Sequence, residues 1–278
     1  MWGGIFIGLD VFRPVFLPLD RHVVITGPTR SGKTKLAVKI VKRARRPAVV
    51  LDWHGEYPHL KIDPRWLKID LNFDKKLLSE VLGISLNLNE PSIYFLYRAI
   101  KRAEVRTIQD VITALDNFLV ATKSEVEMKA AIARRLEYVA EVFDGGVLPI
   151  EALFKTKRPI SVDLSKLRLY EERVLVSLFV LTSLYFYLSR GGLSREAKML
   201  LVVDEAQNIL GRGEVVKYLV YESAKFGLRV VLVSNEMPPH GLLVHSTLII
   251  TKPHFTYRLD VEGSVLIKDN KFEKIWII

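Results

Sequence analysis

A glycine-rich segment near the start of the chain has the residue types and spacing of a phosphate-binding loop. It follows the pattern G-x-x-x-x-G-K-[ST] with the residues Gly27, Pro28, Thr29, Arg30, Ser31, Gly32, Lys33 and Thr34. Its glycines let the backbone wrap closely around phosphate, and the helix that follows adds its positive dipole end. In this pattern Lys33 reaches the β- and γ-phosphates and the Thr34 hydroxyl binds Mg²⁺. The segment therefore predicts a site for Mg-ATP.

Two adjacent carboxylates at the end of an apolar run supply the second half of this chemistry. The run Lys198–Asp204 is typical of a buried strand, and Glu205 follows it directly. At this position Asp204 can hold Mg²⁺ through water, and Glu205 can act as the general base for the attacking water. The alternative is an ordinary strand-end Asp-Glu pair that caps a turn. The phosphate loop favours hydrolysis, and the absence of an Asn-Lys-x-Asp motif disfavours a GTPase switch.

A third polar segment, Asp52–Tyr57, follows another apolar strand. Strand ends on this side of a parallel sheet face the ligand crevice. Glu56 is therefore predicted to assist the water or to sense the γ-phosphate. The alternative role for Glu56 is turn formation around Gly55.

The elements that must position these residues alternate between strands and helices. The predicted strands are His22–Thr26, Ala48–Asp52, Pro159–Leu164, Lys198–Asp204, Arg229–Ser234 and Thr247–Thr251. The predicted helices between them are Lys33–Ala44, Glu171–Ser189 and Glu214–Phe226. This order predicts an α/β fold with a mostly parallel sheet. The tail Phe255–Ile278 is expected to form β-hairpins with turns at Glu262-Gly263 and Asp269-Asn270.

A helical segment interrupts this pattern after the second strand. Apolar residues recur at helical spacing in Ile93–Ala103, Ile108–Ala121 and Glu125–Phe143. Ser124 and Glu127 have the spacing of a capping box for the last helix. We therefore predict an ATPase core of residues 1–73 and 147–278, with an inserted helical subdomain of residues 74–146.

Composition narrows the class of protein. The 278 residues include no cysteine, which excludes disulfides and thiolate metal sites, and the six histidines show no zinc-type cluster. No signal peptide is visible, and the apolar run Val174–Leu188 is short for a membrane span, so we predict a core helix and a cytoplasmic protein. The net charge of +10 is concentrated in residues 1–73, where 13 Lys/Arg against 6 Asp/Glu give +7. A polyanion partner is compatible with this charge.

Together these segments resemble the HerA–FtsK superfamily of ring-forming DNA motors, particularly the HerA-like branch. The resemblance rests on Gly27–Thr34, on Asp52–Tyr57 as a D-x-H-G-E-Y segment, on Asp204-Glu205-Ala206, and on Ser234-Asn235 as the polar sensor after a strand. It covers nearly all of the chain and implies a RecA-like core. It also implies that Asn235 donates to the γ-phosphate or the water.

The resemblance implies an ATP-driven translocase that acts on double-stranded DNA without sequence preference, through backbone contacts. The resemblance implies a homo-oligomer, a hexamer, with ATP at subunit boundaries. Two cellular roles stay open: DNA-end processing with a nuclease partner, or DNA transfer (conjugation or DNA import) with a membrane-channel partner. An ATP-dependent switch without translocation and a small-molecule kinase are alternatives from other classes.

The chain departs from the family pattern at two places. The sensor reads Ser234-Asn235-Glu236-Met237 in place of a Thr-Gln-Arg-Pro-like stretch, so no arginine finger is assigned among Arg212, Arg229 and Arg258. About twenty residues precede the first predicted core strand, too few for the β-barrel that leads many members. The segment Gly211-Arg212-Gly213 is either a DNA-contacting loop or, as we prefer, an ordinary glycine turn.

Overall fold

The computed structural model describes residues 4–10, 13–143, 145–252, 264–268 and 271–277. The chain divides into two compact units. The first comprises residues 1–62, 153–165 and 181–278, and the second comprises residues 63–152 and 166–180. Thus the second unit contains the whole 74–146 segment and extends beyond it on both sides.

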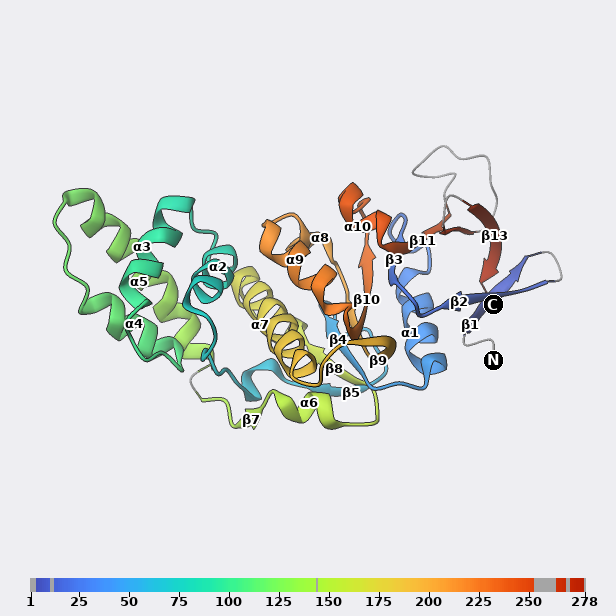
Figure 1. Cartoon of the computed structure of the whole chain (residues 1–278), viewed down its shortest axis with the longest axis horizontal. Coiled ribbons are helices and arrows are strands. Elements are labelled where there is room, and N and C mark those ends of the chain that lie inside the picture. Colours follow the sequence, from blue (N-terminus) through green and yellow to red (C-terminus); the bar gives the residue numbers. More distant parts are fainter. Residues whose placement is uncertain (1–3, 11–12, 144, 253–263, 269–270, 278) are drawn as a thin grey trace. The chain divides into compact units, whose positions relative to one another are not determined.

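The first unit is built on a single sheet (Figure 1). Its strands, in sheet order, are β2 (Arg13–Pro18), β1 (Gly4–Asp10), β13 (Lys271–Ile277), β12 (Ser264–Lys268), β11 (Ser246–Thr251), β3 (His22–Thr26), β10 (Phe226–Ser234), β9 (Ser194–Val203), β4 (Ala48–Asp52), β8 (Ile160–Asp163) and β5 (Leu60–Ile62). All neighbours from β11 to β5 pair in parallel, and all neighbours from β2 to β11 pair antiparallel. The predicted α/β fold with a mostly parallel sheet is confirmed.

Helices cover the parallel strands, which explains why these strands are continuously apolar. Every residue of β3 and β4 is buried. Helix α1 (Lys33–Ala44) packs against β3 and β10 through an apolar face that includes Leu36 and Ile40, and α9 (Glu214–Ser223) packs against β10 from the other side (Figure 1). Strands covered on both faces lose the alternating pattern of a half-exposed sheet.

The register of the central strands brings their carboxyl ends to one level. Thr26 of β3 pairs with Ser234 of β10, and Val203 of β9 pairs with both Leu232 of β10 and Leu51 of β4. Each of these strands therefore delivers its next residues to the same edge of the sheet. This edge is where a parallel α/β sheet binds ligands.

The antiparallel extension was only partly predicted. Strands β12 and β13 form the expected hairpin, whereas both predicted turns, at Glu262-Gly263 and Asp269-Asn270, lie outside the described residues. The β1–β2 hairpin was not predicted. It joins the sheet because β1 pairs with β13 near the other end of the chain, for example Gly8 with Ile277.

The second unit is mainly helical. Its elements are the 3-10 turn Pro64–Trp66, β6 (Leu67–Lys68), α2 (Lys75–Ser85), α3 (Glu90–Ile100), α4 (Ile108–Asp116), α5 (Lys123–Phe143) and β7 (Leu148–Pro149). The predicted cap of α5 was wrong. The helix begins one residue before Ser124, so Thr122 accepts the N–H of Glu125 (3.2 Å) and Glu125 accepts the N–H of Ala121 (2.8 Å).

The remaining elements are α6 (Glu151–Lys155), the 3-10 turn Leu164–Lys166, α7 (Tyr170–Ser189), α8 (Gln207–Leu210) and α10 (His240–Val244). Helix α7 is long and apolar enough to cross a membrane, but 67% of its most apolar window is buried inside the structure. Such burial agrees with the predicted core helix. Gly211 ends α8 and Gly213 precedes α9, so Gly211-Arg212-Gly213 is the turn between these helices.

A buried histidine generates a prediction about acid stability. His22 is 1% exposed, and its Nδ1 accepts the N–H of Val230 (3.0 Å). Burial, together with the nearby Arg229 guanidinium, lowers the pKa of His22 to about 4. Because the unfolded chain binds this proton more readily, the free energy of unfolding falls as the pH drops below the ordinary histidine pKa.

For His22 alone we expect a loss of about 2 kcal/mol in the free energy of unfolding between about pH 7.5 and about pH 5. The His22→Asn variant keeps an acceptor for Val230 but has no proton to gain. Urea unfolding of both proteins across this range measures the difference in slope, which is independent of any constant cost of the substitution. Parallel stability curves would contradict the prediction.

Candidate active site

The phosphate loop lies between β3 and α1, as its sequence requires. Gly27 has φ 149°, and a Cβ at this position would come within 2.2 Å of the Thr251 Oγ1 and 2.4 Å of the Thr251 carbonyl oxygen. Thr251, at the end of β11, also donates to the Thr26 carbonyl (3.1 Å) and shares a hydrogen bond with Ser31 (2.5 Å). A neighbouring strand therefore fixes the loop and excludes any side chain at its first glycine.

The start of α1 is suited to an anion. Gly32 precedes the helix in the left-handed conformation (φ 97°), and the first turn of the helix contains no acidic residue. The free N–H groups and the dipole of this helix end thus face no competing carboxylate from the helix itself.

The ammonium group of Lys33 is held among three oxygens. It donates to the carbonyls of Gly27 (2.8 Å) and Pro28 (2.9 Å) and to Oδ1 of Asn235 (2.7 Å). Burial lowers the pKa of Lys33, whereas the Glu205 and Asp204 carboxylates oppose this shift. An anionic partner would stabilise the charged form of this partly buried ammonium group.

The carboxylate pair follows β9 at the same edge. The Asp204 N–H donates to the Leu51 carbonyl (3.2 Å), which fixes the strand end beside β4. Burial, followed by the negative charge of Glu205, raises the pKa of Asp204 to about 7. Two poorly solvated carboxylates repel each other when both are ionised, and a bound cation relieves this repulsion.

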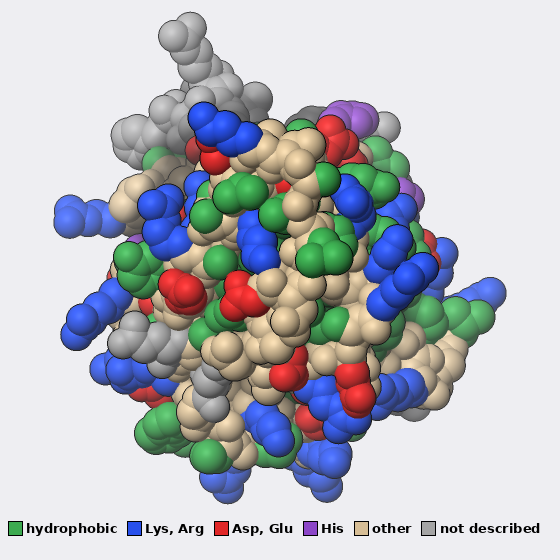
Figure 2. Space-filling view, turned by 90° about the vertical axis from the view of Figure 1, so that its left-hand side faces the viewer, with side chains coloured by type: hydrophobic (Ala, Val, Ile, Leu, Met, Phe, Trp, Pro, Cys, Tyr) green, Lys and Arg blue, Asp and Glu red, His purple; other side chains and the backbone are tan. Residues whose placement is uncertain are grey.

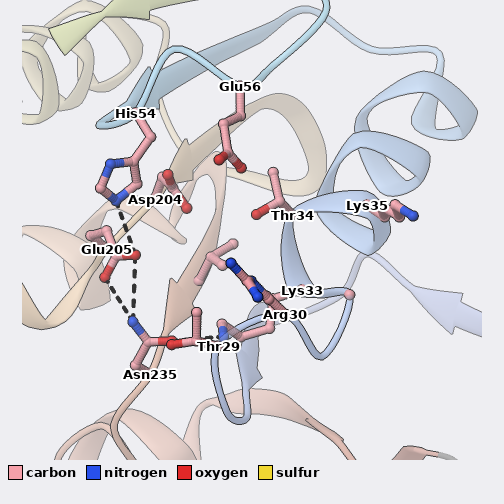
Figure 3. A pocket seen from close by; sticks show the side chains of 12 residues that line it. Thr29, Arg30, Lys33, Thr34, Lys35, His54, Glu56, Asp204, Glu205 and Asn235 are labelled. Atoms are coloured by element: carbon pink, nitrogen blue, oxygen red, sulfur yellow. Dashed lines mark hydrogen bonds and ion pairs between the residues drawn. The ribbon is translucent and has the colours of Figure 1, made fainter. Parts of the chain in front are cut away.

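Glu205 adopts an unusual backbone conformation for its residue type, with φ 47°. Its carboxylate accepts from Nδ2 of Asn235 (3.1 Å) and from Gln207, and it lies 3.3 Å from Nε2 of His54. Non-glycine residues in the left-handed region persist only where the surroundings hold them. Here Gln207, two residues further along the chain, and two side chains from distant segments, His54 and Asn235, contact the carboxylate; Figure 3 shows the contacts of His54 and Asn235.

Asp52 builds the turn that presents the Asp52–Tyr57 segment. It is fully buried and accepts from the N–H groups of Glu56 (3.0 Å) and Tyr57 (3.0 Å) and from the Ser161 hydroxyl (3.1 Å). The turn is thus formed by Asp52, while the side chain of Glu56 faces the pocket (Figure 3).

One pocket of about 680 Å³ gathers nearly all of the predicted site. It is lined by Thr29, Arg30, Gly32, Lys33, Thr34, Lys35, His54, Glu56, Asp204, Glu205, Val233 and Asn235. These include every residue predicted for catalysis or for Mg²⁺. Gly27, Pro28 and Ser31, also predicted to bind the nucleotide, do not line it.

Three residues that contact Glu205 or the phosphate loop were not predicted from the sequence: His54, Gln207 and Thr251. His54 is the histidine of the D-x-H-G-E-Y segment, but no role at the site was predicted for it, because the histidines were assessed only for zinc binding. Gln207 follows Glu205 by two residues, a spacing with no strong signal of its own. Thr251 ends a predicted strand, but its contact with Gly27 depends on sheet order.

The three arginines considered as candidates for an arginine finger differ in their location. Arg229 is 3% exposed, and its guanidinium donates to the carbonyls of Leu19, Ala224, Leu228 and Arg195. These contacts give Arg229 a structural role and remove it from the set. Arg212 lies in the turn before α9, and Arg258 lies outside the described residues.

Among the described residues, no group of three or more His, Asp and Glu side chains is arranged to hold a metal ion by itself. The Thr34 hydroxyl and the Asp204 carboxylate are instead two oxygen donors at one edge of the pocket. Mg²⁺ is commonly bound by one or two protein oxygens together with substrate phosphates and water. This donor set therefore fits Mg²⁺ that arrives with a nucleotide.

Comparison with solved structures shows the same fold in two proteins. VirB4 of Thermoanaerobacter pseudethanolicus matches with a TM-score of 0.73 and 16% identity, over 100% of this chain and 97% of that one. The plasmid coupling protein TrwB in complex with the ATP analogue ADPNP matches with a TM-score of 0.57 and 12% identity, over 93% and 78%. TrwB in complex with ADP and Mg²⁺ matches with a TM-score of 0.51 and 13% identity, over 96% and 81%.

The comparison with curated proteins found no match. The sequence model of a protein family, described as the central domain of the helicase HerA, matches residues 15–182. This match covers more than half of the chain and includes both the phosphate loop and the Asp52–Tyr57 segment. The chain therefore belongs to the HerA helicase central-domain family and is a P-loop ATPase of the HerA–FtsK type.

Proposed function

We propose that this chain binds Mg-ATP in the pocket at the carboxyl edge of the sheet and hydrolyses it to drive movement along double-stranded DNA. The observation that carries the hydrolysis step is the chain of contacts from Lys33 through Asn235 to Glu205. It links the residue that binds phosphate to the residue that activates water.

The predicted site residues then have these roles. Amide groups of Gly27–Thr34 cradle the phosphates, and Lys33 binds the β- and γ-phosphate oxygens. Thr34 and, through water, Asp204 would hold Mg²⁺, which neutralises charge that develops on the phosphates. Glu205 accepts a proton from water as the water oxygen bonds to the γ-phosphorus and the bond to the β–γ bridging oxygen breaks, giving ADP and phosphate. Glu56, which lines the same pocket, assists the water.

Asn235 couples nucleotide binding to the position of the base. An ammonium group has three N–H donors, and all three donors of Lys33 are used in this structure. Binding two phosphate oxygens requires at least two of them, so Lys33 must leave existing partners. Loss of the Lys33 contact frees the Asn235 amide, which also donates to Glu205. We infer that phosphate entry thereby releases Glu205 toward the water.

The DNA part of the proposal is supported by the HerA family match and by the basic charge of the chain. Backbone phosphate contacts would make this binding independent of sequence and sensitive to salt. In this proposal the working form is a homo-oligomer, a hexamer, with ATP at subunit interfaces, and it acts in the cytoplasm.

A second candidate role is the motor of a DNA-transfer system. It is favoured by the fold match to TrwB, which is a bacterial conjugative coupling protein. This role requires a membrane-channel partner, whereas DNA-end processing requires a nuclease partner. The ATP chemistry is the same in both roles.

The proposed function predicts that duplex DNA stimulates ATP hydrolysis and that Glu205→Gln lowers the rate about 100-fold or more, because general-base catalysis contributes on the order of 10²–10⁴. Phosphate release should be measured with and without DNA, alongside the oligomer mass. The exposed Glu127→Gln provides a control for loss of one carboxylate. DNA-independent turnover by a monomer would contradict the motor and favour an ATP-dependent switch.

The coupling role predicts that Asn235→Ala and Asn235→Asp both lower kcat by about 10–100-fold, with a smaller change in nucleotide affinity. Asn235→Asp keeps an acceptor for Lys33 but cannot donate to Glu205. Steady-state kinetics together with ATP-binding titrations separate the two functions of the amide. Near-normal kcat in Asn235→Asp would show that Asn235 serves only to position Lys33.

A further inference from the structure

A second hollow of the first unit lies between α1 and the β1–β2 hairpin. Two adjoining cavities of about 990 Å³ and 580 Å³ share the residues Gly4, Ile5, Phe16, Arg43 and Arg45. We call them together the basic groove. Helix α1 packs against β1 and lies beside the hairpin (Figure 1). No residue that lines the basic groove also lines the nucleotide pocket.

The basic groove lies at the amino edge of the sheet, opposite the nucleotide pocket. Arg195 is near the start of β9, whose other end leads to Asp204. Arg45 directly follows the last residue of α1, whose first turn belongs to the phosphate loop. A ligand in the groove therefore does not compete with nucleotide. The same helix contributes Lys35 to the pocket and Lys39 to the groove.

Six cations line the groove: Lys39, Lys42, Arg43, Arg45, Arg46 and Arg195. Of the acidic residues that the structure describes, Asp20 and Glu196 line it with them. None of the six forms a salt bridge with an acid in the part of the chain that the structure describes. By contrast, basic and acidic side chains are interspersed on the face in Figure 2. Uncompensated positive charge in a hollow attracts a polyanion.

Arg43 is already fixed in place for such a partner. Its Nη1 donates to the Phe6 carbonyl (2.6 Å), and its guanidinium lies over the Phe6 ring (5.1 Å). Phe6 in turn contacts Phe16 edge to face (5.9 Å), and Phe16 is 48% exposed. A guanidinium held in this way loses little entropy when its free N–H groups bind phosphate oxygens.

We propose that the basic groove binds the phosphate backbone of DNA. Arginine-rich composition favours phosphate over a carboxylate-bearing protein segment, because the guanidinium fork suits tetrahedral phosphate and the exposed Phe16 ring offers a face to a sugar or base. The proposal rests on the proposed function in that it locates the DNA contact of the motor. It adds that the contact includes the edge of the sheet farthest from ATP.

The test compares two triple variants with the same change in charge. Lys39→Glu, Lys42→Glu and Arg46→Glu alter the groove, whereas Lys76→Glu, Lys101→Glu and Lys123→Glu alter exposed positions of the second unit. Anisotropy of a labelled duplex across a salt series measures affinity. Loss of three phosphate contacts lowers the slope of log affinity against log salt by about 3. We expect this loss, and at least tenfold weaker binding, only in the groove variant.

ATP hydrolysis without DNA at the wild-type rate shows that the groove variant is folded. If the variant does not fold, the test is repeated with Gln in place of Glu at the same three positions. Wild-type DNA affinity and salt slope in the groove variant would overturn the groove assignment while leaving the proposed function intact. Absence of DNA binding by the wild-type chain would overturn the DNA part of the proposed function as well. If polyglutamate displaces the labelled duplex as well as unlabelled DNA of equal charge does, the groove binds an acidic protein segment and the proposal is wrong.

Discussion

The alignment of four neighbouring strand ends is the constraint on which the active site depends. Strands β3, β10, β9 and β4 pair in parallel and end at the same level. The phosphate loop, the Asn235 amide, the carboxylate pair and the Asp52–Tyr57 turn each follow one of these ends. Because β3 and β4 are buried along their whole length, a shift of register would move apolar side chains out of the core at one end and polar strand-end groups into it at the other. The packing of the core therefore holds the polar groups together.

Burial at this edge also explains the electrostatics of the pocket. Asp204 has a pKa raised to about 7 and Lys33 has a lowered pKa, which means that each charge is poorly solvated without a partner. Lys33 donates hydrogen bonds to backbone carbonyls and to Asn235. The Glu205 carboxylate accepts hydrogen bonds from Asn235 and Gln207 and lies beside His54. In the proposed mechanism, a bound phosphate and its cation replace some of these partners. The contacts of the ligand-free pocket therefore hold Lys33 and Glu205 near the positions where the mechanism needs them, and ligand entry exchanges the partners.

Much of this arrangement could be predicted from local sequence. The bounds of β3, α1 and β4 were predicted to the residue, because a loop motif and continuous apolar runs define them. The carboxylates were predicted because they follow an apolar run typical of a buried strand, whereas Asn235 was predicted from the family resemblance. Other features depend on contacts between distant segments. Thr251 meets Gly27 only through the order β11-β3, and the β1–β2 hairpin joins the sheet only through β13. Local patterns do not encode such pairings.

In the proposed mechanism, Lys33, Asn235 and Glu205 together form the γ-phosphate site. A structure with a non-hydrolysable ATP analogue and Mg²⁺ would show whether they do. We expect Lys33 Nζ to leave at least two of its present partners for the β- and γ-phosphates, with the Glu205 carboxylate facing the γ-phosphate. A complex in which Lys33 keeps all three present contacts, or in which the phosphates lie outside the loop Gly27–Thr34, would contradict it.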